Sequence, residues 1–139
     1  MIPQIVVGPS KRDMLTVNIA TSTAIEQGDL ISLESAEAVL MDAVTEDATF
    51  LGYAFTSHFT DQAEPDKLVV ALKGIVTYDC TSGSSYDFAD NLKYAAENSL
   101  AIASDNVMAF VAKSGVGTVT RVDALIDVLM LQKLFVASA

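Results

Sequence analysis

The sequence is poor in the residues that carry most enzyme chemistry and metal binding. Its 139 residues include one histidine, His58, one cysteine, Cys80, and no tryptophan. A single cysteine excludes an intrachain disulfide, and so few imidazole and thiol groups leave too few ligands for zinc. The lack of tryptophan weakens the case for a sugar-binding platform. We therefore expect no metal and no cofactor.

Basic residues are scarce as well. Eight Lys and Arg stand against eighteen Asp and Glu, which gives a formal net charge of −10. A surface of that sign repels phosphate backbones and anionic membranes. The only dense basic spot is Lys11-Arg12, and Asp13 follows it directly. The charge therefore predicts no nucleic-acid partner.

Long apolar runs are also missing. The longest, Ala124 to Val136, is interrupted by Asp127 and by Gln132-Lys133, and it is shorter than the ~20 residues that a membrane span needs. The first ten residues have no basic leader and no long apolar stretch, so they do not match a signal peptide. These features predict a soluble protein without a membrane partner.

What the sequence does have is apolar residues in short runs between turn residues. Half of the chain, 51%, is hydrophobic, which is enough for a core. Short strand-like runs recur every 8–12 residues or so, and no long amphipathic helix precedes the last segment. This pattern predicts an all-β fold, a small barrel or sandwich. The predicted strands of the first half are Met14–Ile19, Leu30–Leu33, Ala38–Met41, Phe50–Phe55 and Leu68–Tyr78.

Two of these assignments need a choice. Residues 36–44 contain Ala and Glu, which favour helix, but the flanking turns favour a short buried strand. Gly52 lies inside a predicted strand, where a glycine indicates a bulge or a close backbone approach, and Gly74, inside another, is a bulge candidate.

The second half of the chain repeats the pattern of the first. The turn Asp90-Asn91-Leu92 corresponds to Gly28-Asp29-Leu30, and Met108–Ser114 corresponds to Leu51–Ser57. We therefore predict pseudo-repeats at 24–80 and 86–126 that close on each other in one β domain, 24–139, preceded by an arm and first strand at 1–23. The other matched segments are Ala38–Met41 with Ser99–Ala103, and Val70–Val76 with Val119–Ile126.

The two ends of the chain differ from this repeat. Residues 1–10 are predicted to form an extended arm, since Pro3 and Pro9 disfavour helix and Ile5, Val6 and Val7 favour strand. Residues 123–136 fit either a short helix capped by Asp123 or a strand. In both cases the segment is too apolar to stand free in water, so we expect it to be buried, against a second copy of the chain.

No set of residues predicts catalysis. Ser57, His58 and Asp61 invite comparison with a triad, but adjacent side chains on an extended backbone point apart. We therefore interpret His58 as a solvated loop histidine. Cys80 has no basic neighbour that would lower its pKa, and it is interpreted as a small, half-buried residue. Gly115-Val116-Gly117 is interpreted as a hairpin turn, because a nucleotide loop needs a third glycine and a helix after it.

Calcium is the remaining metal to consider. Carboxylates gather in two loops, at Asp61, Glu64 and Asp66 and at Asp87 and Asp90. They do not follow the twelve-residue EF-hand pattern, and we interpret them as charges that solvate the loops. The sequence therefore predicts no metal site and no enzyme.

The order of the motifs resembles one group of proteins. An extended arm precedes the turn Gly28-Asp29-Leu30, then come Leu51-Gly52-Tyr53-Ala54 and the strand Val70 to Val76, and the second half is a degraded copy. This pattern is similar to the small capsid decoration (cement) proteins of tailed bacteriophages, including the DUF2190-like families. The second turn, Asp90-Asn91, and the apolar carboxyl-terminal segment depart from the group's pattern.

The resemblance implies a structural protein of the virion. Such a protein is made in the host cytoplasm and binds the outer surface of the assembled head, with the major capsid protein as its partner. Self-association into a trimer, or a dimer as the alternative, would suit the local symmetry axes of a shell. A head–tail joining or tail-tube subunit is the alternative in the same class, and a small β-barrel module that binds a sugar or calcium is the alternative in another.

Contact residues follow from this implied function. The arm would bind the capsid by adding a strand to a neighbouring subunit, and the apolar segment would mediate self-association. The predicted capsid-binding residues are Ile2, Pro3, Ile5, Val6, Val7, Lys11 and Arg12. The predicted self-association residues are Leu125, Val128, Leu129, Leu131, Leu134 and Phe135.

Overall fold

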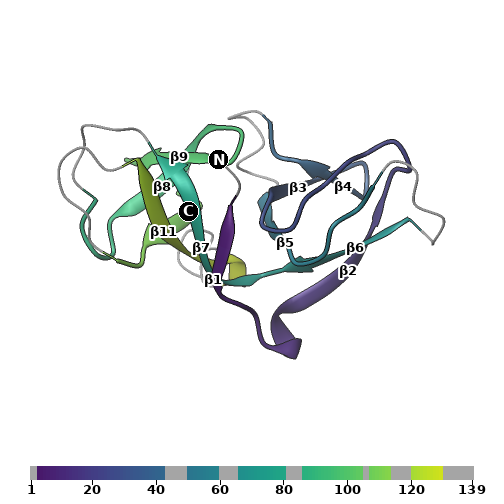
Figure 1. Cartoon of the computed structure of the whole chain (residues 1–139), viewed down its shortest axis with the longest axis horizontal. Coiled ribbons are helices and arrows are strands. Elements are labelled where there is room, and N and C mark those ends of the chain that lie inside the picture. Colours follow the sequence, from purple (N-terminus) through teal and green to yellow (C-terminus); the bar gives the residue numbers. More distant parts are fainter. Residues whose placement is uncertain are drawn as a thin grey trace.

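The computed structural model describes residues 3–42, 50–59, 66–80, 86–104, 107–113 and 120–129. In this part of the chain the strands form two closed five-stranded barrels (Figure 1), which confirms the predicted all-β fold made of two halves. No helix among these residues is long and apolar enough to cross a membrane.

The first barrel has the strand order β2-β4-β3-β5-β6. Its pairings are antiparallel except that of β2 with β4, which is parallel. The strands are β2 (Met14–Ile19), β3 (Leu30–Glu34), β4 (Glu37–Leu40), β5 (Phe50–Ala54) and β6 (Lys67–Ala71). Strand β4 confirms the choice of strand over helix for its segment, while residues 43–49 lie outside the described residues.

The second barrel follows in the sequence and has the order β7-β11-β10-β8-β9, closed by a parallel pairing of β9 with β7. A further strand, β1 (Gln4–Val7), pairs with β7 from outside this ring. The strands of the second barrel are β7 (Lys73–Cys80), β8 (Asn91–Ala96), β9 (Ser99–Ile102), β10 (Ala109–Val111) and β11 (Arg121–Asp127).

The two barrels are copies of one topology. Strands β2, β3, β4, β5 and β6 pair with one another in the same order and direction as β7, β8, β9, β10 and β11. Leu72 is the boundary between the two copies. Its amide N donates to Asp13 O at the start of the first copy, and its carbonyl accepts from Val128 N at the end of the second, so the two bonds occupy corresponding places. The bounds drawn from the sequence, 24–80 and 86–126, leave β2 out of the first copy and assign β7 to it.

The matched segments agree with the structure at one place and not at another. The carbonyl of Ala54 accepts a hydrogen bond from Gly28 N, and the carbonyl of Val111 accepts one from Ala89 N in the second copy. Ala54 and Val111 hold the same place in the two matched segments, so Leu51–Ser57 and Met108–Ser114 are correctly aligned where they are described. The same two bonds make Ala89 the counterpart of Gly28. The predicted match of the turns is therefore wrong by one residue.

Hydrophobic packing joins the barrels. The core of the first barrel is made of Ile19, Ile25, Ile31, Ala38, Ala54, Leu68 and Val70. A larger cluster fills the second barrel and also contains Leu30, Met41 and Tyr53 of the first. Side chains of the first barrel thus point into two cores, one on each side of its sheet.

Hydrogen bonds cross the same interface. Tyr78 Oη donates to Gly28 O at 2.7 Å, and Tyr53 Oη donates to Lys73 O at 3.0 Å. Gly74 follows Lys73, and a Cβ there would lie 2.1 Å from Tyr53 Oη. The register of β7 with β11 continues without a shift through Gly74, so this pairing does not contain the bulge predicted there. At the other predicted bulge, the register of β3 with β5 shifts next to Gly52.

Two strand predictions need correction. Leu68–Tyr78 is not one strand, because β6 ends at Ala71, Leu72 lies between the strands, and β7 begins at Lys73 with partners in the other barrel. Asp123 lies inside β11, so a helix does not begin there; Val128 and Leu129 are helical, and residues 130–139 lie outside the described residues.

Candidate functional site

The amino-terminal arm is extended, as predicted, but it is paired within its own chain. Gln4, Ile5 and Val7 of β1 lie opposite Thr77, Val76 and Ile75 of β7 in an antiparallel pairing. The strand is short and stands last in the order of its sheet, so among the described strands none pairs with the other edge of β1.

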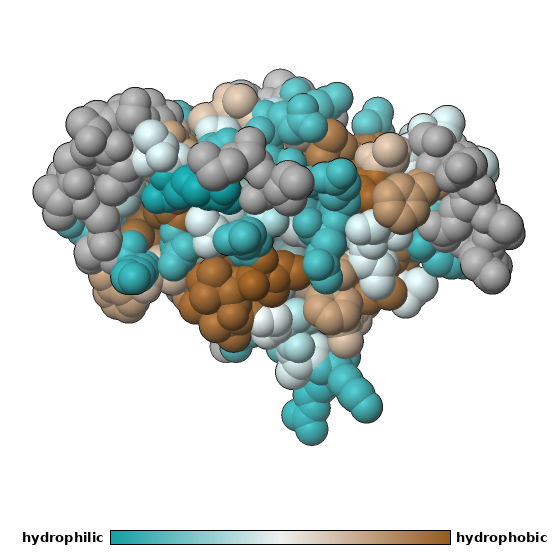
Figure 2. All heavy atoms as spheres, viewed as in Figure 1, coloured by the Kyte–Doolittle hydropathy of each residue, from teal (hydrophilic) through white to brown (hydrophobic). Residues whose placement is uncertain are grey.

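The predicted capsid-binding residues of the arm have different environments. Pro3 is buried and contacts Gly28, and Ile5 packs against the larger core. Val6 and Val7 are 56% and 50% exposed. Ile2 lies outside the described residues. Figure 2 shows a group of apolar residues at the lower centre of this face, in the region where Figure 1 draws β1.

Lys11 and Arg12 lie in a short 3-10 turn, η1 (Lys11–Asp13), between β1 and β2. Both are exposed. The turn projects from the lower margin of the molecule in Figure 1. Ser10 Oγ donates to the Asp13 carboxylate at 2.7 Å, which holds this acid within the turn.

The predicted self-association residues are only partly described. Leu125 is half-buried on the outer side of β11, Val128 is buried and Leu129 is 55% exposed. Leu131, Leu134 and Phe135 lie outside the described residues.

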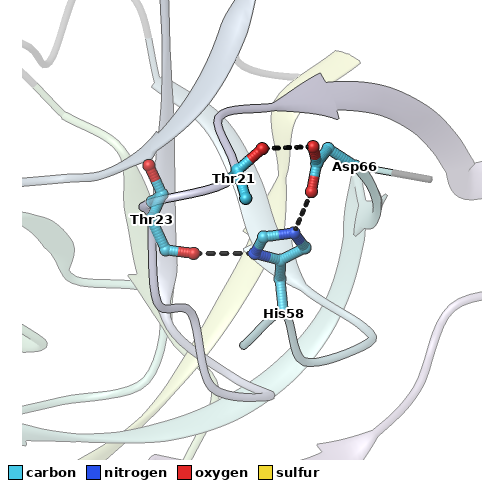
Figure 3. Close-up of polar contacts among 4 residues, drawn as sticks. All are labelled: Thr21, Thr23, His58 and Asp66. Carbon is cyan, nitrogen blue, oxygen red and sulfur yellow. Dashed lines mark hydrogen bonds and ion pairs between the residues drawn. The ribbon is translucent and has the colours of Figure 1, made fainter. Parts of the chain in front are cut away.

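The prediction for His58 is wrong, because this side chain is completely buried. Its backbone pairs with Ile25 through two hydrogen bonds of 2.9 Å, which fix the residue against the end of the first barrel. Figure 3 shows the ring held between two oxygens: Nδ1 lies 2.7 Å from Thr23 O, and Nε2 lies 3.0 Å from Asp66 Oδ1.

The partners of this ring define its hydrogen bonds. A backbone carbonyl only accepts hydrogen bonds, so Nδ1 donates to Thr23 O. Nε2 forms the second bond, with the carboxylate of Asp66. Thr21 Oγ1 donates to Asp66 Oδ2 at 2.5 Å. The bonds from Thr21 and from His58, together with the charge of His58, hold the pKa of Asp66 below its ordinary value.

This cluster is built to hold loops together. Ser57, the hydroxyl nearest in sequence, accepts from Gln27 N at 3.1 Å, and Asp61 lies outside the described residues. Both oxygens of Asp66 are occupied by Thr21 and His58, and the imidazole is closed off from solvent. The hydrogen bonds of this cluster join three segments: the loop before β3, the segment after β5 and the residue just before β6.

Other candidate groups also have structural partners. Cys80 is buried, rather than half-buried, and burial is the main reason why its pKa is raised. Asp90 accepts from Asp87 N at 3.0 Å in a tight turn. Within the described ranges, no three His, Cys, Asp or Glu residues come together as metal ligands. Residues 115–117 lie outside those ranges.

Sequence reasoning did not identify two polar groups that the structure makes central. The network of His58 joins residues up to 45 positions apart, and the amide of Asn98 connects the barrels through Leu30 N and Asp29. Neither has a local motif; the only signal was an unusually polar Thr21-Ser22-Thr23 segment before an apolar strand.

Comparison with known proteins adds no assignment: no family model matches this chain, and no curated protein matches it.

Proposed function

We propose that this chain is a structural virion protein that binds the outer surface of an assembled phage capsid and stabilises it. The major capsid protein is its partner, and the proposal includes synthesis in the host cytoplasm and no enzymatic activity. The motif order of the sequence suggests this class, and the double β-barrel is compatible with it.

One observation carries the proposal: β1 presents exposed apolar side chains at an edge that none of the described strands covers. Val6 and Val7 are both about half exposed, on a strand that is already paired with β7. An exposed strand edge can bind an extended segment of another protein by adding it to the sheet. In this arrangement β1 receives a strand from a capsid subunit while staying paired with β7.

The net charge of −10 supports an outer location. An acidic protein is repelled by packaged DNA, and on the outside of the head the shell separates the protein from the DNA. Weak contacts repeated over many capsid sites can together give effective binding, particularly if copies associate with one another. The trimer expected from the resemblance, with a dimer as its alternative, stays a prediction.

The test uses heads of a tailed phage that lack their decoration protein, mixed with this protein and imaged by electron cryomicroscopy. We expect added density on the outer surface, and its loss with Val6→Asp combined with Val7→Asp. These side chains are exposed, so the double variant should keep its circular dichroism spectrum. Leu33→Asp, at a side chain 37% exposed in the first barrel, is the matched control and should bind.

Unchanged occupancy of the β1 variant would remove β1 as the anchor, and no occupancy by the unaltered protein would overturn the proposal. Light scattering and ligand titration then address the alternatives. A closed ring would favour a head–tail joining or tail-tube subunit, and a monomer that binds a sugar or calcium would favour a ligand-binding module.

A further inference from the structure

The first barrel has an open strand edge. On one side, β2 pairs with β6 along Met14–Asn18. On the other side, its parallel pairing with β4 begins only at Asn18 and Ile19. Leu15 and Thr16 are exposed, Leu15 by 45%. Among the described strands, none therefore pairs with residues 14–17 on the β4 side.

The second barrel shows what this edge accepts. Strand β7 is the counterpart of β2, and its parallel pairing with β9 is likewise confined to its last two residues, Asp79 and Cys80. Further back, at Ile75–Thr77, the same edge is covered by β1 in antiparallel orientation. One copy of the repeat thus holds an antiparallel strand where the other copy, in the part that the structure describes, holds none.

Backbone geometry defines which groups face the open edge. Asp13 O accepts from Leu72 N, and Ile19 N donates to Asp66 O, so odd residues of β2 direct their backbone groups toward β6. Because these directions alternate along a strand, Met14 and Thr16 direct their N–H and C=O groups toward the open side. Unpaired groups of this kind are a template for another strand.

We propose that this edge binds β2 of a second copy, so that two chains form a two-fold dimer with a continuous sheet across both first barrels. An isologous contact fits because the same open edge is present on each copy. The inference does not rest on the proposed function, and it favours the dimer over the trimer.

The register follows from symmetry. A two-fold axis normal to the sheet pairs residues of the same face, and β4 blocks the edge from Asn18 onward. Leu15 then lies opposite Leu15 of the second copy, and Met14 lies opposite its Thr16. This register covers the exposed Leu15 with an identical side chain and pairs the free backbone groups of Met14 and Thr16.

Charge supports the same register. Glu34 and Glu37 lie directly opposite each other across the β3–β4 hairpin, which places like charges together. Glu37 also pairs with Asn18, at the end of the open edge. The second copy would bring Lys11 and Arg12, which lie just before its β2, to this hairpin. The neighbouring Asp13 of that copy is already hydrogen-bonded to its own Ser10. This contact would use the only dense basic spot of an acidic chain.

Cross-linking tests the register. In this pairing Leu15 occupies a position without hydrogen bonds between the two strands, where Cα atoms lie about 4.5 Å apart, a separation that a disulfide can bridge. We expect Leu15→Cys, oxidised by oxygen with copper-phenanthroline, to form a covalent dimer whose linkage maps to residue 15 of both chains. Leu33→Cys, similarly exposed on a strand paired on both sides, is the matched control and should stay monomeric on a denaturing gel.

Light scattering supplies the second measurement. The unaltered protein should have the mass of a dimer, and Thr16→Pro, which removes one N–H from the open edge, should be a folded monomer. Lys11→Glu with Arg12→Glu should weaken association on the order of tenfold, and adding Glu34→Lys with Glu37→Lys should restore it. A monomeric unaltered protein, or cross-linking of Leu15→Cys no faster than the control, would overturn the proposal. So would a dimer that survives Thr16→Pro.

Discussion

At the scale of the single residue, His58 shows what a sequence does not reveal. Its neighbours Ser57 and Phe59 are both at least partly exposed, and the surrounding loop is rich in acids, so a solvated side chain was the reasonable prediction. The structure buries it because its partners, Thr23 and Asp66, come from other segments. Burial that depends on contacts between distant segments leaves no local pattern.

This network predicts a specific acid sensitivity. The pKa of Asp66 is lowered from 3.8 in the folded chain, chiefly by the hydrogen bonds from Thr21 and His58. Between 3.8 and the lower folded value, the unfolded chain binds more protons, so the free energy of unfolding decreases as the pH falls. The stabilisation is complete above this window. Asp66→Asn should therefore lower stability at neutral pH and flatten the loss of stability in acid.

Urea unfolding followed by circular dichroism across the acid range measures both effects. Asp42→Asn is the control, since Asp42 is an exposed carboxylate that follows β4 and is not one of the four residues of the network, and it should leave the acid profile nearly unchanged. Equal acid profiles for the unaltered protein and Asp66→Asn would contradict the prediction.

At the scale of the element, strand existence was predictable and strand partners were not. The apolar run Leu68–Tyr78 contains real strands, but nothing in it marks Leu72, where the partners change from one barrel to the other. The arm was predicted to be extended because of its prolines and β-branched residues, and its pairing with β7 depends on an edge that only the fold creates. The alternation of apolar and polar residues indicates which side chains of a strand are buried, but it does not indicate which other strand pairs with it.

The pairing of β1 predicts an alternation in amide exchange along β7. Leu72 O accepts from Val128 N and Cys80 N donates to Thr120 O, so even residues of β7 face β11 and odd residues face β1. Ile75 and Thr77 should exchange on the order of tenfold or more faster than Val76 and Tyr78, because a short marginal strand opens more easily than a central pair. Hydrogen exchange by NMR measures this.

Removal of residues 1–7 provides the matched comparison. It should abolish the residual protection of Ile75 and Thr77 and leave Val76 and Tyr78 protected. Equal protection of odd and even residues in the unaltered protein would mean that β1 opens no more readily than β11.

At the scale of the whole molecule, the repeat was recognisable because both copies keep the same buried strands. The match of Leu51–Ser57 with Met108–Ser114 was correct where it is described, since both segments need small and aromatic residues at the same positions of a barrel. The turns were misaligned by one residue because Ala89 adopts the positive φ, 72°, that Gly28 adopts in the first copy at 94°. A non-glycine residue in that conformation gives no signal in the sequence.

Asn98 is the residue through which one copy stabilises the other. Its Oδ1 accepts from the buried Leu30 N at 3.0 Å, and its Nδ2 donates to Asp29 Oδ1 at 2.9 Å. Its φ of 51° is one that glycine adopts freely. Asn98→Gly therefore keeps the turn and removes only the bonds between barrels. We expect it to lower the free energy of unfolding by about 1–3 kcal/mol, the cost of leaving a buried amide unpaired.

The repeat supplies the control for this variant. Ala36 lies in the corresponding turn of the first barrel with a φ of 64°, and Ala36→Gly should raise stability by about 1 kcal/mol because it relieves that conformation. Urea unfolding by circular dichroism compares the two. Because Leu30, Met41 and Tyr53 share one core with the second barrel, each variant should still unfold in a single transition. Two separate transitions, or equal shifts for Asn98→Gly and Ala36→Gly, would mean that the barrels are stable independently of this contact.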